Sequence, residues 1–144
     1  MRQPRILLAE DQAQVLQFCQ TFHESTCNVV GAVQDESDLI AATMASSPDL
    51  LVIDIDLPRM NGMEAIRQVR KIVPHCYVIL VTCCAEPESM AAAYDIGVSV
   101  YLVKGSSPDL TQAIQALIIQ PLKTREWTMV PPIGYPELSL LSTA

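Results

Sequence analysis

Four apolar runs of this chain each end in polar or charged residues that could take part in chemistry. These residues are Glu10-Asp11, Asp54, Thr82 and Lys104. Carboxylates gathered in one place repel one another unless a cation lies among them, and hard oxygen ligands suit Mg²⁺. An ionised aspartate such as Asp54 can attack a phosphoryl group and form an acyl phosphate. Mg²⁺ and Lys104 would neutralise the phosphoryl oxygens, and Thr82 would donate a hydrogen bond to them. The set indicates phosphoryl chemistry, provided that the fold brings the four ends together.

The elements that must position these residues are predicted strands that alternate with predicted helices. We expect strands over Ile6–Ala9, Val29–Val33, Leu50–Asp54, Tyr77–Thr82 and Val100–Val103. Strands that are apolar on both faces imply a parallel sheet with helices on each side. In such a sheet ligands bind beyond the carboxyl ends of the strands, so the four polar ends should lie along one edge.

Helical spacing of apolar residues predicts five helices between and after the strands. The first carries Val15, Phe18, Cys19 and Phe22, and the second spans 38–45. The third runs from Gly62 to before Pro74, and the fourth from Pro87 to a stop at Gly97. The fifth follows Ser107. Ser107 should cap the last helix, with Pro108 at its first position and Asp109 in its first turn. Its apolar stripe is Leu110, Ala113, Ile114, Leu117 and Ile118.

Composition limits the class of protein. The chain has 144 residues, of which half are apolar, so it should form one domain with a sizeable core. Its net charge of −7, without a cluster of Lys and Arg, argues against a nucleic-acid-binding surface in this chain.

The five cysteines form no CxxC pair, which favours reduced thiols in a cytoplasmic protein, and Cys83-Cys84 are expected to be buried. No signal peptide or membrane-length apolar stretch is present, so no membrane contact is expected.

The character of the sequence changes near residue 120. Residues 121–144 hold four of the ten prolines and the only tryptophan, Trp127, without sustained periodicity. We therefore expect one folded domain over 1–120, followed by a Pro-rich tail or truncated linker over 121–144.

Over roughly residues 4–120, the chain resembles the receiver domain of two-component response regulators. The matching features are the acid pair Glu10-Asp11, the run from Asp54 through Pro58 to Gly62, Thr82, and Tyr101-Leu102-Val103-Lys104. Gaps of 43, 28 and 22 residues separate Asp11, Asp54, Thr82 and Lys104, close to the usual spacing of the family. Residues 100–106, with Gly105 after the lysine, are most similar to the NarL/LuxR subfamily.

The resemblance implies a flavodoxin-like (CheY-like) doubly wound (βα)5 fold with parallel sheet order 2-1-3-4-5. It implies that Asp54 accepts a phosphoryl group from the phosphohistidine of a sensor histidine kinase. The implied Mg²⁺ ligands are Glu10, Asp11, Asp54 and the backbone carbonyl of Asp56. Thr82 and Lys104 would contact the phosphoryl group, Thr82 and Tyr101 would form the switch, and Cys83 would gate access to the site. Whether the Lys104-Gly105 peptide bond is cis stays open.

The expected output is a population shift in which Thr82 and Tyr101 rearrange around the phosphoryl group. This would remodel the face built by the fourth helix, the fifth strand and the fifth helix, and so control homodimerisation or an output domain. The chain is either the receiver of a transcription factor, which would contact DNA only through a C-terminal domain missing here, or a single-domain receiver acting through protein contacts.

Two other functions compete with this one. A degenerate receiver would act only as a protein-interaction module. Asp54-Ile55-Asp56 also fits the Asp-x-Asp opening of haloacid-dehalogenase phosphatases, but here it follows the third strand and no late acidic pair follows Lys104. In the receiver hypothesis the protein is no enzyme beyond its own phosphorylation and dephosphorylation.

Overall fold

Five strands alternate with five helices along the described chain. The computed structural model describes residues 3–22, 27–105 and 110–119. The strands are β1 (Arg5–Ala9), β2 (Asn28–Val33), β3 (Leu50–Asp54), β4 (Tyr77–Thr82) and β5 (Val100–Val103). The helices are α1 (Gln12–Thr21), α2 (Glu36–Ser46), α3 (Gly62–Ile72), α4 (Pro87–Asp95) and α5 (Leu110–Ile119).

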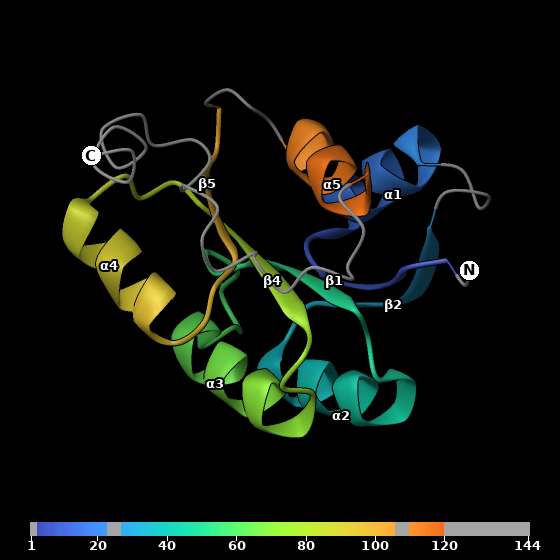
Figure 1. Cartoon of the computed structure of the whole chain (residues 1–144), viewed down its shortest axis with the longest axis horizontal. Helices are drawn as coiled ribbons and strands as arrows, with labels where there is room; N and C mark the ends of the chain where they lie inside the picture. Colours follow the sequence, from blue (N-terminus) through green and yellow to red (C-terminus); the bar gives the residue numbers. More distant parts are fainter. Residues whose placement is uncertain (1–2, 23–26, 106–109, 120–144) are drawn as a thin grey trace.

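The strands form one parallel sheet in the order β2-β1-β3-β4-β5. Helices α1 and α5 cover one face of this sheet, and α2, α3 and α4 cover the other (Figure 1). The predicted flavodoxin-like fold and strand order are confirmed. All carboxyl ends of the strands lie along the same edge, as a parallel sheet requires.

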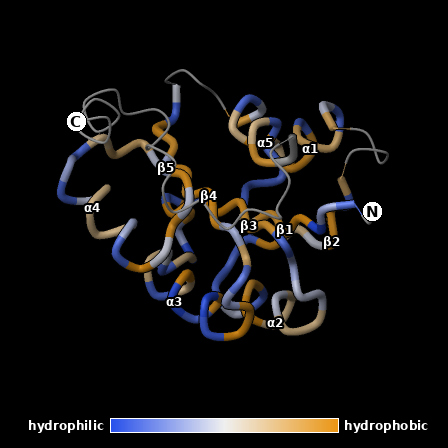
Figure 2. Tube along the Cα trace, viewed as in Figure 1, coloured by the Kyte–Doolittle hydropathy of each residue, from blue (hydrophilic) through white to orange (hydrophobic). Residues whose placement is uncertain are grey.

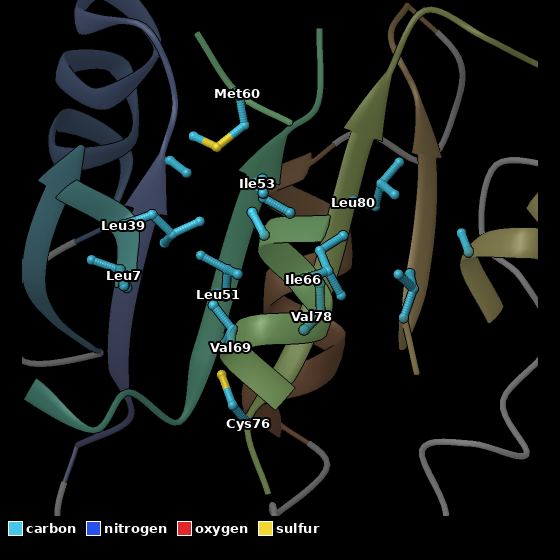
Figure 3. Close-up of a cluster of buried hydrophobic side chains, with 14 of the residues drawn as sticks. Leu7, Leu39, Leu51, Ile53, Met60, Ile66, Val69, Cys76, Val78 and Leu80 are labelled. Carbon is cyan, nitrogen blue, oxygen red and sulfur yellow. The ribbon is translucent and has the colours of Figure 1, made fainter. Parts of the chain in front are cut away.

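The core consists of two apolar layers, one on each side of the sheet. Alternate residues of a strand enter opposite layers, so that Leu51 and Ile53 pack with Ile66 of α3, whereas Val52 packs with Ile114 of α5. Figure 3 shows the first of these layers, and Figure 2 shows that the strands are the most continuously hydrophobic part of the chain. Burial on both faces explains why the strands read as unbroken apolar runs in the sequence.

Side-chain caps and one glycine determine several helix ends. Helix α2 begins at Glu36, two residues before the predicted start, because the side chain of Asp35 accepts a hydrogen bond from the backbone N–H of Asp38. Gly97, with φ of +98°, follows the end of α4 as expected.

The predicted cap of the last helix, residues 107–109, lies outside the described residues, as does the 121–144 tail. Of the predicted stripe of α5, Ala113, Ile114 and Leu117 are buried.

Two expectations from composition can be compared with the described residues. No helix among them is both long and apolar enough to cross a membrane. The five cysteines are free thiols, with Cys27 and Cys76 buried. Cys83 is exposed and Cys84 is half-buried, so the expectation that this pair is buried was wrong. The two residues follow β4 at the edge of the sheet, where the strand no longer lies between two layers of helices.

Candidate functional site

The carboxyl ends of β1, β3, β4 and β5 meet at one edge of the sheet. The register pairs Asp54 with Val81 and Thr82 with Val103, which brings the ends of the three last strands to the same level. Glu10, Asp54 and Thr82 are all buried there. The backbone N–H of Lys104 donates to the carbonyl of Thr82 over 2.8 Å, which holds the lysine beside them. The polar ends predicted to converge therefore do so.

Asp54 lies at the centre of this group. Its Oδ2 is 2.9 Å from Lys104 Nζ, and its Oδ1 accepts a hydrogen bond of 2.9 Å from the backbone N–H of Asp56. The carboxylate is only 4% exposed, whereas the lysine side chain is 37% exposed and approaches from the solvent side. Partial burial opposes the charge of Lys104, but the hydrogen bonds and charges of Asp54 and Asp56 outweigh it and raise the pKa of the lysine.

The carboxylate of Asp56 is also part of the site, which the sequence analysis did not anticipate. Its Oδ1 accepts a hydrogen bond of 3.0 Å from the Thr82 hydroxyl, and its Oδ2 accepts one of 2.8 Å from the backbone N–H of Cys83. Lys104 Nζ lies 3.2 Å from the same Oδ2. Partial burial would raise the pKa of Asp56, but the hydrogen bonds from Cys83, Lys104 and Thr82 outweigh it and hold the pKa below its ordinary value. An acid two residues after Asp54 was the available signal, yet only its backbone carbonyl was predicted to be a ligand in the site.

Glu10 carries the most perturbed carboxyl group of the site. Burial, followed by the nearby charges of Asp54 and Asp11, raises its pKa from 4.5 to about 8, although Lys104 opposes this. At neutral pH Glu10 is therefore largely protonated and hydrogen-bonds to Asp54. Glu10 and Asp54 are two buried carboxyl groups in contact, and a divalent cation could bind between them in place of the Glu10 proton.

Asp11 serves a different purpose in this conformation. It is exposed and caps α1, because its Oδ1 accepts a hydrogen bond of 2.8 Å from the backbone N–H of Gln14. Among the residues that the structure describes, no three His, Cys, Asp or Glu side chains are close enough together to hold a metal ion. The donor set nevertheless fits Mg²⁺ in its chemistry, since Glu10 and Asp54 are in contact and Asp11 adjoins Glu10 in the chain. To bind the ion, Asp11 would give up its cap, at a cost of about 1 kcal/mol.

A cavity of about 500 Å³ leads from the solvent to this group. Its lining includes Glu10, Asp11, Asp54 and Lys104, together with residues of α1 and α5 such as Phe18 and Leu110. The Asp54 carboxylate, although almost fully buried, therefore borders a cavity that a small molecule or a side chain could enter.

The predicted switch residues are connected by hydrogen bonds. The Tyr101 hydroxyl donates to the carbonyl of Cys84 over 2.8 Å, and the backbone N–H of Cys84 donates to Thr82 Oγ1 over 3.1 Å. Tyr101 is 1% exposed, so its ring points into the protein, and this burial raises the pKa of its hydroxyl. The side chain of Cys83 is exposed at the rim, and its predicted gating role stays a prediction.

Comparison with known proteins identifies the family. The model of the response regulator receiver domain matches residues 6–115. This chain belongs to the response regulator receiver family. Among the relatives of this receiver, the transcriptional regulatory protein PdtaR of Mycobacterium tuberculosis is 28% identical over 118 residues, which are 79% of this chain and 56% of PdtaR. The response regulator protein VraR of Staphylococcus saprophyticus is 33% identical over 93 residues, which are 64% of this chain and 44% of VraR.

Solved structures agree with this assignment. A LuxR-family two-component response regulator from Aurantimonas matches with a TM-score of 0.70 and 26% identity, over 82% of this chain and 86% of that one. The signal receiver domain of a putative NarL from Mycobacterium tuberculosis matches with a TM-score of 0.69 at 22% identity, over 83% and 99%, which supports the fold. The predicted NarL/LuxR-like character of this receiver is thus confirmed. The receiver spans about half the length of the curated relatives it matches.

Proposed function

We propose that this receiver accepts a phosphoryl group on Asp54 from the phosphohistidine of a sensor histidine kinase. The observation that carries the proposal is the buried Asp54 carboxylate with Lys104 Nζ at 2.9 Å, on an edge shared with Thr82 and Glu10. These are the groups that phosphoryl transfer to a carboxylate needs: a nucleophile, a cation and a hydrogen-bond donor.

In the transfer an oxygen of Asp54 attacks the phosphorus atom. A P–O bond forms, the P–N bond to the donor imidazole breaks, and the imidazole nitrogen leaves with the electron pair and takes up a proton. Lys104 would neutralise the charge that develops on the phosphoryl oxygens, and the Thr82 hydroxyl would donate a hydrogen bond to them. Glu10, Asp11, Asp54 and the carbonyl of Asp56 would hold Mg²⁺, which supplies further neutralisation of those oxygens when it is bound.

Labelling with acetyl phosphate and Mg²⁺ tests the acceptor. Intact-mass spectrometry should show one added phosphoryl group on the wild type and none on Asp54→Asn. The control Asp38→Asn removes one exposed carboxylate from the first turn of α2 and should label normally. An unlabelled wild type would indicate a degenerate receiver, and continuous release of phosphate with many turnovers would favour a haloacid-dehalogenase-like phosphatase.

The phosphorylated receiver would act through the face formed by α4, β5 and α5, and would form a homodimer or control an output domain. The hydrogen-bonded connection from Thr82 through Cys84 to Tyr101 of β5 supports this direction of signalling.

Any contact with DNA would be made by a domain outside these 144 residues, because a net charge of −7 does not suit a DNA-binding surface. A phosphohistidine donor and free thiols suit a cytoplasmic location. Tyr101→Ala should abolish phosphorylation-dependent association, measured by analytical ultracentrifugation.

A further inference from the structure

Three donors of the site converge on a group of the protein itself. The hydroxyl of Thr82, the backbone N–H of Cys83 and the ammonium of Lys104 all contact the carboxylate of Asp56, at 3.0, 2.8 and 3.2 Å. Thr82 and Lys104 are the groups that the proposed function assigns to the phosphoryl oxygens. Two oxygens with a negative charge, surrounded by these donors, make the contacts that a phosphoryl group would make.

We propose that the Asp56 carboxylate acts as an internal stand-in for the phosphoryl group, and that it holds the switch of this receiver in the inward arrangement before Asp54 is modified. The proposal rests on the proposed function, since it assumes that these donors otherwise serve phosphorylated Asp54. It makes Asp56 a positioning residue that acts on Tyr101 through Thr82.

The connection from Asp56 to the switch is continuous. Asp56 Oδ1 accepts from the Thr82 hydroxyl, Thr82 Oγ1 accepts from the N–H of Cys84, and the Cys84 carbonyl accepts from the Tyr101 hydroxyl. Thr82 and Tyr101 are each 1% exposed, so the middle and the Tyr101 end of this connection are buried in the protein. With the Asp56 carboxylate removed, the Thr82 hydroxyl loses its charged acceptor, and the arrangement that orients Cys84 toward Tyr101 is weakened.

The location of Asp56 also allows it to leave. Its side chain is 36% exposed, whereas that of Asp54 is 4% exposed, so the stand-in can swing into solvent while the acceptor stays in place. The backbone of Asp56 is fixed independently, because its N–H donates to Asp54 Oδ1 over 2.9 Å. Phosphorylation would thus exchange one anionic ligand of Thr82 and Lys104 for another.

The consequence is a receiver whose unmodified form already populates the inward position of Tyr101. In such a receiver phosphorylation would strengthen an existing arrangement instead of creating it. Substitution of Asp56 should then increase, not decrease, the response of the switch to a phosphoryl group.

Fluorine NMR of protein labelled with 3-fluorotyrosine tests this, with the Tyr101 signal assigned by Tyr101→Phe. In the unmodified wild type Tyr101 should be mainly inward, and beryllofluoride with Mg²⁺ should change its signal little. In Asp56→Ala the ratio of inward to outward Tyr101 should fall at least about tenfold, as expected for loss of a hydrogen bond to a charged group. Beryllofluoride should then restore the inward signal. The isosteric Asp56→Asn keeps one acceptor oxygen for Thr82 and should give a smaller fall.

Asp38→Ala is the matched control, because it removes an exposed carboxylate on α2 and should leave the Tyr101 signal unchanged. The proposal would be overturned if Tyr101 were as inward in unmodified Asp56→Ala and Asp56→Asn as in the wild type. Tighter binding of beryllofluoride by these variants would not rescue it, because removing a negative charge from the site would by itself strengthen that binding. An outward Tyr101 in the unmodified wild type would also overturn it. If Asp54 is never labelled but Tyr101 still depends on Asp56, the proposed function fails and the internal contact stands.

Discussion

Replacing Glu10 with glutamine should stabilise the folded protein above neutral pH, in the absence of divalent cations. Glu10 is 3% exposed, and burial together with the charges of Asp54 and Asp11 raises the pKa of its carboxyl group from 4.5 to about 8. Glutamine has the same shape, carries no charge, and can still donate a hydrogen bond to Asp54. The substitution therefore removes the cost of ionising a buried acid and leaves its packing in place.

The sign follows from the two pKa values. Between pH 4.5 and 8 the folded protein holds the Glu10 proton and the unfolded chain releases it. Rising pH therefore favours the unfolded chain, and the stability that the bound proton provides is complete below 4.5 and is lost as the pH rises through 8. At about 1.4 kcal/mol per pH unit, the upper limit of this loss is about 4 to 5 kcal/mol.

Urea denaturation in EDTA at pH 5, 6, 7 and 8 measures the difference. The free energy of unfolding of Glu10→Gln should be close to that of the wild type at pH 5 and should exceed it increasingly up to pH 8. Glu88→Gln, which removes an exposed carboxylate in the first turn of α4, should differ from the wild type by a few tenths of a kcal/mol at every pH. If the difference between Glu10→Gln and the wild type does not change with pH, the reasoning about Glu10 is refuted.

Three further predictions use the same unfolding assay. Mg²⁺ should stabilise the wild type more than Glu10→Gln at pH 8, and equal stabilisation would contradict the assignment of Glu10 as a ligand. Gly62→Ala should cost about 1 to 3 kcal/mol, because the new Cβ would lie 2.5 Å from Ile55 Cβ. Gly31→Ala should cost less, because its new Cβ would approach the flexible end of Leu7 at 3.0 Å and Ala42 Cβ at an ordinary contact distance of 4.0 Å. Burial raises the pKa of Cys76 from 9.0 to about 12. Under reducing conditions the free energy of unfolding should therefore fall between pH 9.0 and about 12, with a slope of up to about 1.4 kcal/mol per pH unit. Cys76→Ser should lessen this slope.

Much of the fold could be predicted because its signals are local. The bounds of β3, β4 and β5 agree with the apolar runs at Leu50–Asp54, Tyr77–Thr82 and Val100–Val103. A strand buried on both faces must be apolar along its whole length, so the sequence marks its ends clearly. The start of α2 was less clear, because the capping bond of Asp35 depends on the conformation of its backbone and not on apolar spacing.

The membership of the site was also determined by the sequence, except for the carboxylate of Asp56. Once the strands are parallel, their carboxyl ends share one edge, and Glu10, Asp54, Thr82 and Lys104 must approach one another. Their types then predict phosphoryl chemistry with a divalent cation. This conclusion needs the order of elements and the residues at their ends, but no side-chain conformation.

Only the tertiary structure decided how these side chains pair. The carboxylate of Asp56 meets Thr82 and Lys104, which are 26 and 48 residues away in the chain, so no local pattern could orient it. Likewise, the proton on Glu10 depends on burial and on the charge of Asp54, and Tyr101 points inward because the carbonyl of Cys84 is within reach of its hydroxyl. The sequence by itself determined which strand-end groups meet at the sheet edge. Distance and burial, which exist only in the folded chain, decided which of them bind one another and added the carboxylate of Asp56 to them.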